Sequence, residues 1–132
     1  MLARGGGVIV NTGSMSGILA DVTRSMYGIT KTAIMGLTNT IATQYGRQGI
    51  RCVTIAPGLV LTPAAAAVMS PEEIAHHARQ SPLNRGAEPS DVAELVAFLA
   101  SDGGAYISGE TIRLDGGMGA HLPSFADDIA VA

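Results

Sequence analysis

The stretch that decides the fold class is residues 51–58, whose sequence is RCVTIAPG. It predicts a strand over Arg51–Ala56 that the Pro57-Gly58 pair ends, because proline and glycine mark turns. Side chains alternate between the two faces of a strand. One face carries Cys52, Thr54 and Ala56, and the other carries Val53 and Ile55.

Two further strands are expected on either side of this one in the chain. Val8–Asn11 is a short apolar run entered from three glycines, which is typical of a buried parallel strand. The last strand is expected over Glu110–Leu114, after a lead-in at Ile107–Gly109 and before the turn Asp115-Gly116-Gly117.

The segments between the strands have helical patterns. From about Met26 to Arg47, apolar residues recur at spacings of three and four, namely Ile34, Leu37, Ile41 and Tyr45. Residues 59–67 are expected to form a loop or a short helix. Ser70-Pro71-Glu72-Glu73 carries a capping box that opens a helix ending near Gln80. Another helix begins at Pro89, with a buried stripe of Val92, Leu95, Val96 and Leu99. Strands separated by helices predict a parallel sheet with right-handed crossovers, and hence an α/β fold.

Composition limits the class of protein. The chain has 132 residues, of which 47% are hydrophobic and 14% charged, so we expect one globular domain over residues 1–132. No apolar run reaches the roughly eighteen residues of a membrane span, and no signal peptide is evident, so a cytoplasmic location is the default expectation. The single Cys52 cannot form an internal disulfide. A net charge of -3 gives no reason to expect nucleic acid as a partner.

Tyr27 and Lys31 are the first candidates for chemistry. Four residues apart on a helix, they lie about forty degrees from one another, and Lys31 shares the stripe of Ile34, Ile41 and Tyr45. An ammonium aimed at the apolar side needs a partner or a task, and a cation one turn from a phenol favours the phenolate. The ordinary alternative is a surface pair in which the lysine stem extends to water.

Ser14 is the second candidate, because it follows an apolar strand by a few residues and parallel strands place functional groups at their carboxyl ends. Its hydroxyl could hydrogen-bond a substrate oxygen. The ordinary alternative is a turn serine that bonds its own backbone. His76 and His77 lie on the capped helix, where we expect them to be solvated, and no spacing suggests a metal site.

Taken together, these segments resemble the short-chain dehydrogenases and reductases. The resemblance rests on GVIVNTGS (7–14), YGITK (27–31), GIRCV (49–53), APGLVLTP (56–63) and SGE with LDGG (108–110 and 114–117), in matching order and spacing. It implies a partial Rossmann-like parallel sheet of about three strands with flanking helices, and an NAD- or NADP-dependent oxidoreductase that acts on an alcohol or carbonyl compound.

The resemblance also implies residue roles. Tyr27 would be the acid/base at the substrate oxygen, Lys31 would hold the nicotinamide ribose, and Ser14 would orient the carbonyl. Pro57 and Gly58 would shape the floor under the nicotinamide. The Val60 backbone and Thr62 would meet its carboxamide or the nearby phosphates.

One part of the family pattern is missing. The glycine-rich Thr-Gly-x-x-x-Gly-x-Gly turn and the residue that distinguishes NAD from NADP are absent, so the chain looks like a carboxyl-terminal half that lacks the dinucleotide-binding half. We therefore expect weak or no cofactor binding by the chain alone. We also expect an exposed edge on the first strand, together with homo-oligomerisation or association with a separate amino-terminal half.

Two other functions remain open. Ser14, Tyr27 and Lys31 could serve a cofactor-independent hydrolase as nucleophile and base on an ester substrate, although no Gly-x-Ser-x-Gly elbow is present. The chain could also be a non-catalytic oligomerising fragment.

Overall fold

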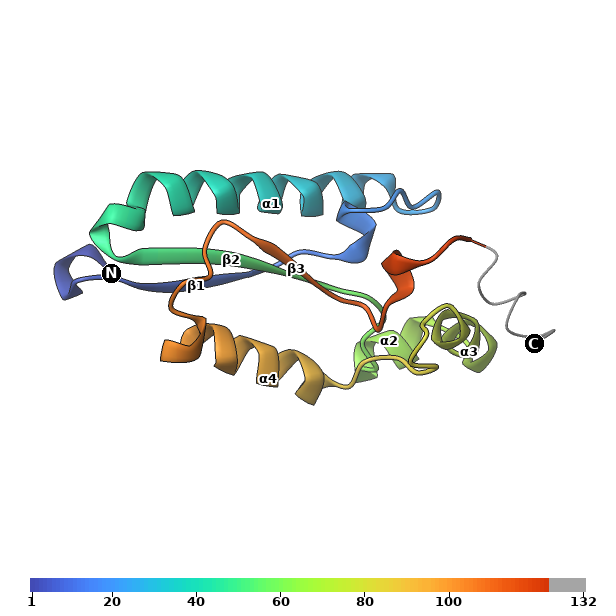
Figure 1. Ribbon diagram of the computed structural model, residues 1–132. Coiled ribbons are helices and arrows are strands. Elements are labelled where there is room, and N and C mark those ends of the chain that lie inside the picture. The colour runs from blue at the N-terminus through green and yellow to red at the C-terminus, as the bar shows by residue number, and fades with distance from the viewer. Residues whose placement is uncertain (124–132) are drawn as a thin grey trace.

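The computed structural model describes residues 1–123 and contains a three-stranded parallel sheet (Figure 1). Its strands are β1 (Gly7–Thr12), β2 (Ile50–Pro57) and β3 (Thr111–Leu114), in the order β1-β2-β3. This arrangement confirms the predicted α/β class and all three strands. Within residues 1–123, β1 and β3 are the edges of the sheet.

Strand β2 lies at the centre of the molecule. Residues 52–56 are all buried, which explains why the strand has small or apolar side chains on both faces. It pairs with β1 from Gly7–Ile50 to Thr12–Ile55, and with β3 from Thr54–Thr111 to Pro57–Leu114. The carboxyl ends of β1 and β2 therefore meet at one edge of the sheet.

Helices cover both faces of the sheet. Helix α1 (Ser25–Tyr45) packs on one face and α4 (Pro89–Ala100) on the other, whereas α2 (Pro63–Val68) and α3 (Pro71–Arg79) lie beyond the carboxyl end of β2 (Figure 1). Short 3-10 turns occur at Leu2–Arg4, Met15–Gly17, Gly46–Gln48, Asp102–Gly104 and Met118–Ala120. Among the described residues, no helix is both long and apolar enough to span a bilayer.

The predicted start signals of α3 and α4 are confirmed. The Ser70 hydroxyl accepts from the Glu73 backbone N–H at 3.2 Å, and the Glu73 carboxylate accepts from the Ser70 N–H at 2.7 Å. Helix α4 begins at Pro89, as expected. Its apolar stripe packs against the core residues of β2, with Leu99 fully buried.

The spacing of apolar residues in α1 does not coincide with its buried side. Leu37 is 52% exposed and Tyr45 is 38% exposed, whereas the polar Thr38 is fully buried. Apolar residues occur on both sides of this helix, so their spacing identifies a helix but not the side that faces the sheet. The buried side is set instead by a polar contact with the strands.

This contact is a hydrogen-bonded cluster of three side chains. The hydroxyls of Thr38 and Thr54 are 2.6 Å apart, and the Asn11 amide donates to the Thr38 hydroxyl at 2.9 Å. The cluster joins α1 to β2 and β1, and two of its members, Thr38 and Thr54, are completely buried. Buried hydroxyls are costly unless they are paired, so the cluster holds the helix in one position over the sheet.

We predict that Thr38→Val lowers the free energy of unfolding by about 1–3 kcal/mol, because valine leaves the Thr54 hydroxyl and the Asn11 amide without this partner. Thr40→Val is the matched control: the exposed Thr40 hydroxyl bonds only its own helix, at the Gly36 carbonyl, and its loss is expected to change stability by less than about 0.5 kcal/mol. Urea unfolding followed by circular dichroism measures both. Equal effects of the two substitutions would contradict the role given to the cluster.

Candidate active site

The candidate site lies where β1 and β2 end. Gly13 and Ser14 follow β1, and Gly58 follows β2, which ends at Pro57. The Gly13 N–H donates to the Ile55 carbonyl at 2.7 Å, which keeps the two strand ends together beyond the last paired residues. Chain segments that leave parallel strands at this edge are the usual place for a binding site in α/β folds.

Ser14 is half-buried in an extended conformation and begins the 3-10 turn Met15–Gly17. Its hydroxyl oxygen accepts from the Ser16 N–H at 3.1 Å, so the turn hydrogen bond that we considered as the ordinary alternative is present. A serine hydroxyl has one donor as well as two acceptor positions. The turn bond therefore leaves its O–H donor for a ligand in the space that Ser14 also lines.

Lys31 extends from α1 toward the sheet. Its Nζ donates to the Thr12 carbonyl at 2.9 Å, at the carboxyl end of β1. The same nitrogen lies 5.5 Å from the centre of the Tyr27 ring. The helical wheel thus gave the direction of the lysine correctly, and its partner is a backbone carbonyl. An ammonium has three donors, so two remain for other groups.

Tyr27 and Ser14 line one cleft of about 160 Å³. Five of the residues that the sequence assigned to catalysis or cofactor binding lie in its lining: Ser14, Tyr27, Pro57, Gly58 and Val60. Two others are outside the lining. The Lys31 ammonium is bonded to the Thr12 carbonyl, and the Thr62 hydroxyl accepts from the Ala65 N–H at 3.1 Å as the cap of α2.

The cleft also has members that the sequence analysis did not find. Arg24, which precedes α1, and His77 of α3 line it, and the apolar part of the wall comes from Met15, Leu59, Met69 and Met118. The expectation that both histidines are solvated holds for His76, which is exposed, but is wrong for His77, which is half-buried. No periodicity places α3 relative to the strand ends, so the only signal for His77 was that its helix lies in the segment that covers the substrate in the family that the sequence resembles.

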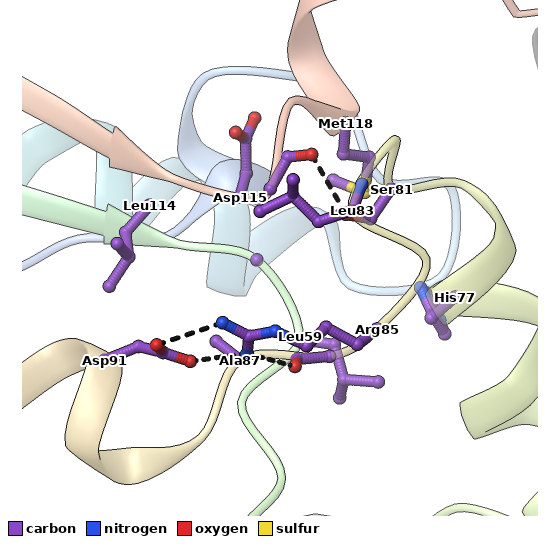
Figure 2. A pocket seen from close by; sticks show the side chains of 13 residues that line it. Leu59, His77, Ser81, Leu83, Arg85, Ala87, Asp91, Leu114, Asp115 and Met118 are labelled. Carbon is purple, nitrogen blue, oxygen red and sulfur yellow. Dashed lines mark hydrogen bonds and ion pairs between the residues drawn. The ribbon is translucent and has the colours of Figure 1, made fainter.

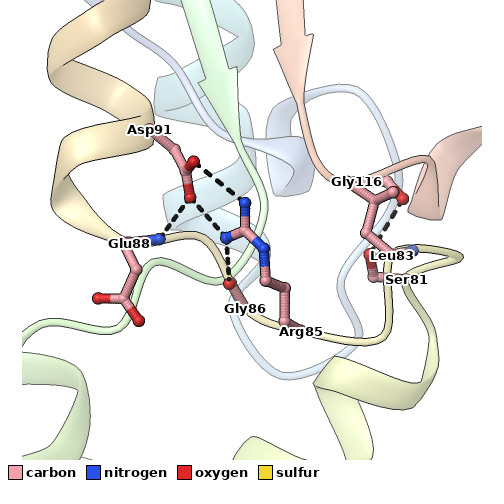
Figure 3. A network of polar contacts seen from close by, with 7 residues as sticks. All are labelled: Ser81, Leu83, Arg85, Gly86, Glu88, Asp91 and Gly116. Atoms are coloured by element: carbon pink, nitrogen blue, oxygen red, sulfur yellow. Dashed lines mark hydrogen bonds and ion pairs between the residues drawn. The ribbon is translucent and has the colours of Figure 1, made fainter.

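A second cavity, of about 180 Å³, adjoins the cleft (Figure 2). The two share Gly58, Leu59, His77 and Met118. On one side of the second cavity Arg85 makes two hydrogen bonds to Asp91, at 2.6 and 3.1 Å, and these bonds, together with the Glu88 N–H, lower the pKa of the Asp91 carboxyl to about 2 (Figure 3). This network fixes the loop between α3 and α4.

The opposite side of that loop is also fixed. The buried Ser81 hydroxyl donates to the Gly116 carbonyl at 3.0 Å (Figure 3). Gly116 has a φ of +62°, and a Cβ there would collide with the Ser81 hydroxyl, so this position requires glycine. The turn Asp115-Gly116-Gly117 therefore helps to hold the end of α3 near the strand ends. Among residues 1–123 no cluster of three or more metal-ligating side chains is present.

Comparison with known proteins identifies the family. A family model described as enoyl-(acyl carrier protein) reductase matches residues 1–119. A probable short-chain type dehydrogenase/reductase of Bradyrhizobium diazoefficiens is 45% identical over 127 residues, which are 96% of this chain and 45% of that protein. The chain belongs to the short-chain dehydrogenase/reductase family.

Other family members extend the comparison to activities and structures. The 7alpha-hydroxysteroid dehydrogenase of Bacteroides fragilis is 46% identical over 94% of this chain and 48% of its own length. An oxidoreductase of the family from Burkholderia thailandensis superposes with a TM-score of 0.89 at 32% identity, covering all of this chain and 52% of that one. A 7 alpha-hydroxysteroid dehydrogenase solved with NADH and 7-oxo glycochenodeoxycholic acid has a TM-score of 0.84 and 32% identity, over 89% of this chain and 46% of that one.

The chain spans about half the length of the curated relatives that it matches. The match is to the carboxyl-terminal portion, as the sequence predicted.

Within that portion, the hydrogen-bonding groups suit one end of a nicotinamide cofactor. They are the hydroxyls of Ser14 and Tyr27, the Lys31 ammonium with two unused donors, and the backbone at the end of β2 beside the cleft. Thr12–Gly17 carries Thr-Gly-x-x-x-Gly, but a 3-10 turn follows β1 there, and α1 begins only at Ser25. That segment therefore does not place a helix N-terminus against a pyrophosphate.

Gly28 allows helix α1 to approach the turn that follows Ser14 closely. A Cβ at Gly28 would lie 2.6 Å from the Ser16 carbonyl oxygen, so glycine is needed where α1 packs on the Met15–Gly17 turn. A Cβ at Gly36 in the same helix would meet nothing within 4 Å.

We predict opposite effects for alanine at these positions. Gly28→Ala should lower the free energy of unfolding by about 1–3 kcal/mol and shift the amide resonances of residues 14–17, because overpacking pushes the turn away from the helix. Gly36→Ala should raise stability by up to about 1 kcal/mol, since alanine is the better helix former. Thermal unfolding and amide NMR spectra test this. Similar behaviour of the two variants would show that the close approach does not constrain the site.

Proposed function

We propose that the chain carries the proton-transferring and substrate-orienting part of an NAD- or NADP-dependent oxidoreductase that acts on an alcohol or a carbonyl compound. The observation that supports this most strongly is the convergence of Ser14 and Tyr27 on one cleft, with the Lys31 ammonium fixed 5.5 Å from the Tyr27 ring. A phenol, a hydroxyl and a cation so arranged can exchange a proton with a substrate oxygen and stabilise the charge that develops on it.

In this proposal each side chain has one task. Tyr27 gives a proton to the carbonyl oxygen in reduction and takes it back in oxidation. The Ser14 O–H donates to the same oxygen and orients it, while the acceptor side of the hydroxyl is used by the Ser16 N–H. Lys31 is held by the Thr12 carbonyl, so its position does not depend on the ligand. Its two remaining donors are directed to the ribose hydroxyls of the cofactor.

The cofactor, when bound, supplies or accepts the hydride. Pro57 and Gly58 would lie under the nicotinamide, because they line the cleft at the end of β2. The Val60 backbone and the donor side of the Thr62 hydroxyl would meet the carboxamide or a nearby phosphate, since the acceptor side of Thr62 already caps α2. The pyrophosphate and the adenosine need a partner outside the described residues. We propose that this partner is an amino-terminal dinucleotide-binding half or a second copy of the chain.

The names of two relatives support an alcohol as the substrate class. Two 7alpha-hydroxysteroid dehydrogenases, from Bacteroides fragilis and Clostridium sardiniense, are 46% and 37% identical to this chain. They act, by name, on a secondary alcohol of a small molecule. Ester hydrolysis gains no support from the contacts, because a base would have to bond the Ser14 hydroxyl, and its described partner is a backbone N–H.

The role of Tyr27 can be tested in a chimera. Residues 1–119 of this chain would replace the matched segment of the Bacteroides fragilis 7alpha-hydroxysteroid dehydrogenase. We predict that Tyr27→Phe lowers kcat for the oxidation of a 7alpha-hydroxysteroid by roughly 10²–10⁴-fold, the usual contribution of a positioned acid/base. Tyr45→Phe, in the same helix and outside the cleft, should leave kcat unchanged. A Tyr27→Phe chimera with full activity would refute the assignment.

Cofactor binding by the 132-residue chain alone is a separate prediction. We expect NADH and NADPH to raise its Tm little or not at all, because the Lys31 and strand-end contacts reach only one end of the dinucleotide. Differential scanning fluorimetry at increasing cofactor concentration measures this. A large, saturable shift would mean that the chain holds phosphate contacts beyond those described.

A further inference from the structure

Arg24 and His77 are two basic side chains that the proposed reaction does not use. They come from different elements, Arg24 from the residue that precedes α1 and His77 from α3, and both line the cleft that contains Ser14 and Tyr27. The cleft therefore has hydroxyl groups at the strand ends and basic groups contributed by the surrounding elements. Its remaining wall is largely apolar.

Arg24 is oriented by a fixed carboxylate. Its Nε donates to Asp21 at 3.1 Å, and Asp21 in turn accepts from the Thr23 N–H at 3.0 Å and the Thr23 hydroxyl at 2.9 Å. These contacts, with those to Thr23 the strongest, lower the pKa of the Asp21 carboxyl to about 2, so it stays ionised. Within residues 1–123 the two Nη groups of Arg24 make no hydrogen bond. A guanidinium held at Nε with its Nη groups available is suited to a carboxylate.

His77 is half-buried at the boundary of the two cavities (Figure 2). Its ring makes an edge contact with His76, at 6.0 Å between ring centres, and has no hydrogen bond to any of residues 1–123. Burial is the main cause that lowers the pKa of His77, and the positive charges of His76 and Arg24 lower it further. The negative charges of Glu73 and Asp21 act in the opposite direction and raise it. Burial and the neighbouring arginine therefore both favour the neutral form of the imidazole.

We propose that Arg24 and His77 bind a carboxylate of the substrate, which makes the substrate an oxo acid or the corresponding hydroxy acid. This inference rests on the proposed function, because it places the carbonyl or alcohol of the same molecule against Ser14 and Tyr27. A carboxylate would accept hydrogen bonds from the unused Nη groups of Arg24 and from the His77 ring, and its charge would offset the unfavourable effect of Arg24 on the imidazolium.

Binding of a carboxylate at this position is coupled to protonation of His77. A bound carboxylate raises the pKa of His77, because it favours the imidazolium over the neutral ring. By linkage, affinity for the acid must then increase as the pH falls through the pKa of His77, and decrease above it. A neutral ligand with the same carbonyl has no such dependence. The other charged groups near the ring are Asp21, whose carboxyl stays ionised, together with Arg24, Glu73 and His76, and His76 lies outside the lining of the cleft.

The experiment compares 4-oxopentanoate with its methyl ester, which has the same carbonyl and no charge. Both are titrated into the 132-residue chain at pH 6 and pH 8, and binding is followed through the histidine ring resonances in NMR spectra. We expect the acid to bind about tenfold or more tightly than the ester at pH 6, as for a charge-assisted hydrogen-bonded contact, with a smaller difference at pH 8. The pKa of His77 should rise with the acid and stay constant with the ester.

Four variants identify the groups responsible. Arg24→Gln should remove the preference for the acid, and Arg24→Lys should retain part of it. His77→Gln should remove the pH dependence, whereas His76→Gln on the same helix should preserve both effects. Because Arg24 and His76 are exposed, unchanged amide spectra outside the cleft will show that these variants remain folded.

The inference is overturned if the acid and the ester bind equally, if neither binds, or if His76→Gln and His77→Gln have the same effect. Its failure can be distinguished from that of the proposed function, because this experiment needs no turnover. A Tyr27-dependent chimera with no preference for the acid would overturn only the substrate class. A preference for the acid with no loss of turnover in Tyr27→Phe would overturn only the proposed function.

Discussion

The hydrogen bond between Thr38 and Thr54 determines where helix α1 lies on the sheet. Both hydroxyls are completely buried and 2.6 Å apart, so any rotation or sliding of the helix would leave two polar groups without partners in the core. Lys31 precedes Thr38 by seven residues, or about two helical turns, and therefore lies on the same side. The contact that fixes Thr38 thus also directs the Lys31 ammonium to the Thr12 carbonyl.

The second constraint acts at the other end of the same helix. The turn that carries Ser14 packs against α1 so closely that a Cβ at Gly17 would lie 2.9 Å from the Lys31 Cβ, and one at Gly28 would reach the Ser16 carbonyl. Small residues on both elements therefore set the distance between the strand end and the helix. The buried threonines fix the rotation of α1 and the two glycines fix its separation from the turn. Together they define the positions of Ser14, Tyr27 and Lys31 before any ligand is bound.

Much of this could be predicted from the sequence, because it depends on local patterns. The strand ended by Pro57-Gly58, the capping box at Ser70 and the stripe of α4 are all properties of neighbouring residues, and the structure confirms them. The direction of Lys31 followed from helical geometry alone. What could not be predicted concerns surroundings: Leu37 is as apolar as Ile34, yet it faces solvent, because a polar cluster with Asn11 and Thr54 decides the buried side of α1. Such a contact joins residues far apart in the chain, and no periodicity reveals it.

His77 shows the same limit at the site itself. Its sequence neighbourhood, with Glu72, Glu73 and Arg79, is that of a solvated helix, and His76 behaves accordingly. What brings His77 to the cleft is the loop that follows α3, which is held by Ser81 on the Gly116 carbonyl and by Arg85 on Asp91. Gly116 belongs to the turn after β3, so the strand that completes the sheet also helps to place α3 over the ends of the other two. A glycine in a positive-φ turn and an ion pair remote from the hydroxyls thereby help to determine which side chain lines the cleft.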